Sequence, residues 1–176
     1  MTESNHNTES VVVLAKGLDQ AHAAIAAVGD DQLALPTPCE EWDVARLLAH
    51  LAHSPGTMLE MARGGSPDWA ALPEQVDDPA GVFRSGADEL LAHWRRTDES
   101  ADWQIAEVAV HTWDLATATG QSVDDLDPEV AERGLTFMSE VLKPELRGDV
   151  FAPEREAPDG ASAYERIAAF AGRDVG

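Results

Sequence analysis

The sequence predicts an all-α protein in which antiparallel helices form a bundle. Three observations lead to this fold class. Alanine and leucine are abundant while runs of β-branched residues are scarce, a composition that favours helix over sheet. Apolar residues recur at steps of three and four along several segments, which is the period of an amphipathic helix. Short connections containing proline, glycine or aspartate separate these segments, as expected between antiparallel neighbours.

The first helix is predicted for residues 11–28, and Gly29 is suited to end it. Its apolar stripe consists of Leu14, Leu18, Ala21, Ile25 and Val28. Residues 1–10 are mostly polar, so we expect them to form a disordered tail. Residues 11–176 are then expected to form a single domain, because no linker divides them.

The second helix is predicted for residues 44–63, after a loop with two prolines. Asp43 is a suitable N-cap, since its carboxylate can accept hydrogen bonds from the free backbone N–H groups of the first turn. Two glycines follow the predicted end. Pro55 and Gly56 lie inside the apolar pattern, where a proline should kink or shorten the helix.

Two aspartate–proline pairs, Asp78–Pro79 and Asp127–Pro128, mark the starts of two further helices. In each pair the aspartate can cap the helix and the proline suits its first position. These signals predict helices over residues 79–96 and 128–142.

The remaining two helices are identified by their ends. Gly120 closes a helix predicted for residues 103–119. Ser162 and Glu165 have the spacing of a capping box, which predicts a short helix over residues 162–171. The order of these elements predicts a four-helix bundle with additional short helices at its C-terminal end.

The charge of the chain limits its partners. The net charge is −21, from 12 basic and 33 acidic residues, so phosphate backbones and anionic membranes should be repelled. We therefore expect no nucleic acid and no membrane partner. No apolar run reaches the length of a membrane span, the first ten residues lack the core of a signal peptide, and Cys39 is the only cysteine. These features predict a cytoplasmic protein.

The segment from Glu107 to Ala118 places ionisable groups where apolar ones are expected. A helix turns by about 100° per residue, so Glu107, His111 and Asp114 lie within roughly 60° of one another on one face. Valines and Leu115 flank this face on both sides. The centre of the apolar arc is therefore occupied by two carboxylates and an imidazole.

A buried carboxylate without a partner is costly, so this arrangement needs an explanation. A bound metal ion, a closed network of buried ion pairs, or a solvent-exposed helix face would each provide one. The spacing of Glu107 and His111 places both side chains one turn apart, as two ligands of a single ion require. The residues alone leave these three alternatives open.

The second predicted helix offers a further ligand. His50 flanks its apolar side while His53 points away, so the pattern favours His50, although both could be surface histidines. His6, His22 and His93 are interpreted as solvated or partly packed.

Two segments also resemble a known family. Residues 35–51, LPTPCEEWDVARLLAHL, resemble the start of the metal-binding domain of mycothiol-dependent maleylpyruvate isomerases, and residues 110–120, VHTWDLATATG, resemble a second signature of this actinobacterial group. The group belongs to the DinB-like superfamily of four-helix bundles. The resemblance implies a divalent metal ion held by His50, Glu107 and His111. Zinc is the first choice, with nickel, manganese or iron as alternatives.

Asp114 could orient His111 or a bound water molecule through a hydrogen bond, or it could be a surface aspartate. We interpret Cys39, Trp42 and Trp113 as packing residues.

The resemblance further implies a metal-dependent transferase or isomerase that acts on a small molecule and uses a low-molecular-weight thiol, mycothiol, as co-substrate. A non-catalytic metal-binding bundle and a metal-dependent hydrolase are the alternatives. Related bundles often pair, so a homodimer is an open alternative to a monomer.

Overall fold

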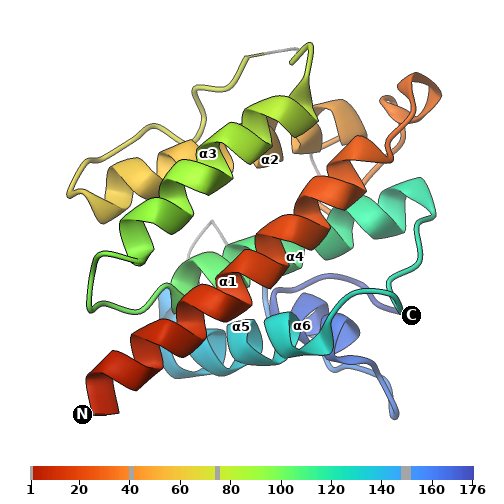
Figure 1. Cartoon of the computed structure of the whole chain (residues 1–176). Coiled ribbons are helices and arrows are strands. Elements are labelled where there is room, and N and C mark those ends of the chain that lie inside the picture. The colour runs from red at the N-terminus through yellow and green to blue at the C-terminus, as the bar shows by residue number, and fades with distance from the viewer. Residues whose placement is uncertain (1, 40–41, 74–75, 148–151) are drawn as a thin grey trace.

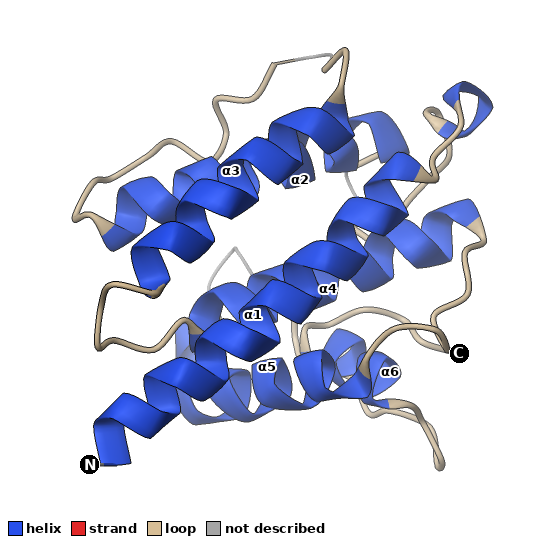
Figure 2. Ribbon diagram, in the orientation of Figure 1, coloured by secondary structure: helices blue, strands red, loops and turns tan. Residues whose placement is uncertain are grey.

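The computed structural model describes residues 2–39, 42–73, 76–147 and 152–176, and within these ranges the chain forms six α-helices and no strand (Figure 2). The helices are α1 (Thr2–Ala26), α2 (Val44–Ala62), α3 (Pro79–Trp94), α4 (Asp102–Thr119), α5 (Pro128–Val141) and α6 (Ala163–Phe170). Residues 40, 41, 74, 75 and 148–151 fall in predicted loops and lie outside the described residues. None of the described helices combines the length and apolarity needed to cross a lipid bilayer.

The first four helices pack as a bundle. Helix α1 contacts α3 and α4, and α2 contacts the same two helices from the other side of the bundle. Helix α5 packs on α4, and α6 packs on both (Figure 1). The prediction of an all-α bundle with added C-terminal helices is thereby confirmed.

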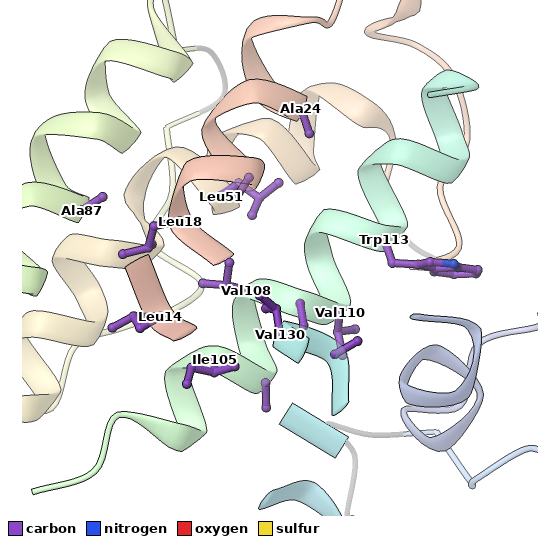
Figure 3. Close-up of a cluster of buried hydrophobic side chains, with 14 of the residues drawn as sticks. Leu14, Leu18, Ala24, Leu51, Ala87, Ile105, Val108, Val110, Trp113 and Val130 are labelled. Atoms are coloured by element: carbon purple, nitrogen blue, oxygen red, sulfur yellow. The ribbon is translucent and has the colours of Figure 1, made fainter. Parts of the chain in front are cut away.

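Helix α4 lies at the centre of this arrangement, between the bundle and the C-terminal helices. Nearly every residue from Gln104 to Ala116 is buried, with Glu107 as the exception. Its apolar side chains join those of α1 and α5 in one cluster, where Leu14, Ile105 and Val130 lie near one another (Figure 3). Because α4 is covered on almost all sides, each of its polar side chains needs a partner within the protein.

The helix ends follow the predicted capping signals. The Asp43 carboxylate accepts a hydrogen bond from the Arg46 N–H at 2.8 Å, and Asp78 caps α3 in the same way. Ser162 and Glu165 form the predicted reciprocal capping box. The predicted boundaries therefore hold closely, except at the start of α1.

The structure differs from the expectation of a disordered tail at residues 1–10, because α1 begins at Thr2. Ser10 is fully buried; its hydroxyl donates to the Asn7 carbonyl at 2.9 Å and accepts from the Ala101 N–H at 3.3 Å. Asn7 in turn donates to the Glu99 carbonyl. The connection between α3 and α4 thus supplies tertiary partners for this polar segment, which the local pattern does not reveal.

Helix α2 continues through Pro55 and is not shortened there. The proline is buried against α3 at Gly86. A Cβ atom at Gly86 would lie 3.2 Å from Pro55 Cβ and 3.3 Å from the Gly56 nitrogen. The missing side chain at Gly86 therefore allows α3 to approach the proline turn, and the packing supports a helix that the sequence marks as interrupted.

Candidate metal centre

The three residues predicted as metal ligands come together between α2 and α4. Nε2 of His50 lies 2.8 Å from Oε1 of Glu107, and Nε2 of His111 lies 3.3 Å from the same oxygen. One ligand atom from each residue lies within 4.8 Å of the other two. Two helices that are separated in sequence therefore direct two imidazoles and one carboxylate toward a common point.

Burial and charge give these groups unequal proton affinities. Burial lowers the pKa of His50, although its hydrogen bond with Glu107 acts in the opposite direction. Burial also opposes charge on His111, but Glu107 and Asp114 outweigh it and raise the pKa of His111 to about 9. Burial alone would raise the pKa of Glu107, yet its two histidine partners lower it. Without a cation, the cluster is thus held by a carboxylate paired with an imidazolium.

The geometry fits a divalent ion. Imidazole nitrogen and carboxylate oxygen are ligands of zinc and of related transition metals. Ligands placed about 2.1 Å from a tetrahedral ion are separated from one another by about 3.4 Å. The observed separations of 2.8 and 3.3 Å therefore need only small side-chain movements to accommodate one.

Asp114 lies behind His111, the position that the orienting role considered in the sequence analysis requires. Its Oδ2 is 3.1 Å from Nδ1 of His111. An Nδ1–H that donates to Asp114 leaves Nε2 as the ring nitrogen available to a cation. Asp114 itself is fully buried, so its charge also requires compensation.

Arg173 supplies that compensation, and sequence reasoning missed it. Its Nε donates to Oδ1 of Asp114 at 3.1 Å, and its Nη2 donates to Oδ2 at 2.9 Å. Such a paired contact is among the stronger charge-assisted arrangements. Arg173 follows α6 in a segment without apolar periodicity, so no local signal connects it with α4.

A second group of ligand-type side chains, Cys39, His111 and Asp114, also has one atom from each within 4.8 Å of the others. Here Nη2 of Arg173 donates to Sγ of Cys39 at 3.3 Å as well as to Asp114. Burial, followed by the charge of Asp114, raises the pKa of Cys39 to about 11. A guanidinium already provides the positive charge in this group, which makes the first group the better candidate for a metal ion.

Tryptophan rings enclose the two imidazoles. The Trp42 ring centroid lies 4.9 Å from that of His50 and is stacked at 5.9 Å on His111. Trp69, in the loop after α2, lies 5.5 Å from His50. The sequence analysis treated Trp42 as packing beside a helix start and did not identify Trp69, since a loop residue carries no periodic signal.

Two other residues lie where they were expected. Trp113 is buried in the hydrophobic cluster and does not line the site, so it is a packing residue. His53 points away from the cluster, and its Nδ1 lies 2.9 Å from the Ala49 carbonyl oxygen of the preceding turn.

A cavity of about 580 Å³ adjoins the cluster, and His50, Glu107 and His111 form part of its wall. The Glu107 side chain retains 25% of its exposure, more than either imidazole. The proposed ligands are therefore accessible to a small molecule and are not sealed inside the protein.

The chain is similar to two uncharacterized proteins of Mycobacterium tuberculosis, Rv0738 of strain H37Rv and MT0763 of strain CDC 1551. The identity to each is 33%, over 89% of this chain and 93% of the relative. No solved structure matches. The family model described as the mycothiol maleylpyruvate isomerase N-terminal domain matches residues 14–136, a range that contains all three proposed ligands but not Arg173. The chain therefore belongs to the mycothiol maleylpyruvate isomerase N-terminal domain family.

Proposed function

We propose that this protein is a metal-dependent transferase or isomerase that acts on a small molecule with a thiol, mycothiol, as co-substrate. His50, Glu107 and His111 hold the divalent ion, with zinc as the first choice. Membership of the family suggests a mycothiol-related, metal-binding function. The observation that carries the proposal is the convergence of two imidazole nitrogens and one carboxylate oxygen on the wall of a cavity.

A divalent cation held by His50, Glu107 and His111 would supply positive charge that lowers the pKa of a thiol at the site and favours its thiolate form. The sulfur then forms a bond to an electrophilic carbon of the substrate. When that carbon belongs to a conjugated C=C bond, the displaced π pair takes up the proton that the thiol lost, and the product is a thioether. In an isomerase the former C=C bond rotates as a single bond, the carbon that took up the proton releases it, and the C–S bond breaks, which restores the C=C bond and the thiol.

The surrounding residues have separate tasks in this scheme. Asp114, held by Arg173, fixes the orientation of the His111 ring through Nδ1. Trp42 packs against both imidazoles and Trp69 packs against His50, and these contacts restrict the orientations of the rings. Structural zinc sites are closed by four protein ligands, whereas catalytic sites keep a position open. Three converging residues beside a cavity favour the catalytic type over a purely structural ion.

The metal content of the purified protein tests the site. We expect about one divalent ion per chain by elemental analysis. Glu107→Gln preserves the shape of the side chain but removes its charge, so it should lose most of the ion. Glu89→Gln is the matched control, because Glu89 is exposed on α3 away from the cavity. Full metal content in Glu107→Gln would refute the proposed ligand set.

The thiol requirement is tested on cobalt-substituted protein. Reduced mycothiol should perturb the visible cobalt absorption, while an equal concentration of an alcohol without a thiol should not. No perturbation, combined with unfolding on addition of a chelator, would favour the non-catalytic alternative. Turnover of an ester or amide in the absence of any thiol would favour a hydrolase.

A further inference from the structure

The cavity beside the proposed ligands is large enough for a substrate as well as for a reactive sulfur. Its volume of about 580 Å³ falls within the range typical of small-molecule sites. His50, Glu107 and His111 occupy one part of the wall. The remaining wall shows what kind of molecule the cavity accommodates.

Most of that remaining wall is apolar, and two helices contribute more than half of its residues. Trp103 and Val110 come from α4, and Phe137 and Val141 come from the C-terminal half of α5. Val141 is 47% exposed, whereas Val110 and Met138 of the same wall are buried. An aliphatic side chain at the rim of an apolar cavity gains favourable burial when an apolar ligand covers it.

The charged groups of the cavity are already paired. Among the described residues of its wall, Arg173 is the only lysine or arginine, and it binds both oxygens of Asp114 and the sulfur of Cys39. The Glu107 carboxylate contacts both histidines. An ionised carboxylate placed against the apolar wall would find no unpaired lysine or arginine there. Such a group would lose its hydration without gaining a hydrogen-bond or ionic partner, which is costly.

We propose that the molecule which accepts the thiol sulfur carries an uncharged apolar group, such as an aryl ring, that lies against Trp103, Phe137 and Val141. This inference rests on the proposed function and specifies its substrate class: conjugated ketones or similar electrophiles with an apolar substituent, rather than dicarboxylates. The sulfur bonds to the β-carbon of the C=C bond, the π pair moves to the α-carbon, and the α-carbon takes up the proton released by the thiol. No oxidant and no leaving group are needed.

Equilibrium binding tests the apolar group separately from catalysis. Benzylacetone and its para-carboxylate derivative differ by one carboxylate group on the ring, and neither carries the reactive C=C bond. Calorimetric titration of the metal-loaded protein should show that benzylacetone binds about tenfold more tightly, because the carboxylate loses its hydration without gaining a partner. Equal or tighter binding of the carboxylate, or no binding of benzylacetone, would overturn the inference.

A charge placed on the wall should reverse part of this preference. Val141→Arg adds a cation at an exposed position that tolerates a long side chain, so the preference for benzylacetone should fall by about fivefold. Val82→Arg adds the same charge at a partly exposed position on α3 that does not line the cavity, and it should leave the preference unchanged. An equal effect of both substitutions would show that the ring does not lie against α5.

The reactive pair, benzylideneacetone and its para-carboxylate, then links binding to turnover. With mycothiol present, the loss of conjugated absorbance should be about tenfold faster for the uncharged ketone. A chain that binds no metal but keeps the binding preference would refute the proposed function alone. A metal-loaded, thiol-responsive chain that prefers the carboxylate would refute the apolar substrate class alone.

Discussion

The two sides of the His111 ring show how similar clusters can have different roles. On the Nε2 side, Glu107 and His50 form a group of three ligand-type residues beside a cavity. On the Nδ1 side, Asp114 and Cys39 form a second such group with the same histidine. Both groups place a carboxylate from the central helix α4 beside an imidazole. Within the described part of the chain, only the second group accepts hydrogen bonds from a guanidinium, that of Arg173.

This difference indicates that the neighbouring cation, and not the cluster of ligands, decides which group is the better candidate for a metal ion. Asp114 is fully buried, but a two-point contact with Arg173 compensates its charge. Among the described residues, the ion-pair partners of Glu107 are the two histidines, which can compensate its charge when protonated. The same carboxylate–imidazole pattern on α4 therefore gives a structural ion pair on one side and a candidate metal centre on the other.

The largest effect is expected from His111→Ala, which removes the residue that both groups share. Loss of an outer-shell partner typically weakens metal binding by roughly 10–100-fold, and loss of a ligand should exceed this range. The bundle should remain folded, because Arg173 still pairs with Asp114. Chelator competition measures the affinity, and circular dichroism checks the fold. One tight ion per chain in this variant would place the metal elsewhere.

Arg173→Met should disrupt the second group directly, while it keeps all three proposed ligand residues of the first group. The substitution leaves the fully buried Asp114 carboxylate without its arginine partner, so we expect a loss of about 3 kcal/mol in the free energy of unfolding. Urea denaturation gives this value from the midpoint and the slope.

Arg155→Met is the matched control for that change. Arg155 pairs with Asp174 at 3.3 Å, but its side chain is 49% exposed, and such pairs contribute about 1 kcal/mol or less. Equal losses for the two arginine variants would mean that Asp114 does not depend on Arg173 for its charge compensation.

The second group contains a thiol, that of Cys39, whose reactivity can be measured. Burial raises its pKa to about 11, so at pH 8 its thiolate fraction should be about 100-fold below that of an unperturbed cysteine. Iodoacetamide should therefore react with native protein at least that much more slowly than with urea-unfolded protein. The native rate should rise about tenfold per pH unit until the pH approaches 11. Equal native and unfolded rates at pH 8 would indicate an exposed or activated thiol.

The smallest effect is expected from His53→Ala, which tests the choice between the two histidines of α2. His53 contacts a carbonyl of its own helix and is outside both groups, so the metal content should not change. The stability should shift by about 0.5 kcal/mol or less, as for other substitutions away from the core. Metal loss in this variant, measured by elemental analysis, would show that His53 and not His50 is the ligand from α2.

Local signals made most of the fold predictable. A capping aspartate or serine forms hydrogen bonds within its own first turn, so Asp43, Asp78 and Ser162 could be identified from a few neighbouring residues. The alignment of Glu107 with His111 was equally accessible, because helical geometry alone places residues four apart on one face. The sequence by itself therefore predicted the helices, apart from the first turns of α1, and the residues of the candidate metal centre.

The tertiary structure decided which of these side chains come into contact. His50 meets Glu107 only because α2 and α4 pack together, and Arg173 reaches Asp114 from a position 59 residues later in the chain. The early start of α1 depends in the same way on the bond between Ser10 and Ala101. These contacts join segments that share no local pattern, and their energy arises only when the packed core brings the partners together. For that reason, the sequence indicated that the carboxylates of α4 need partners, but only the tertiary structure showed which carboxylate is paired with an arginine and which one faces an open cavity.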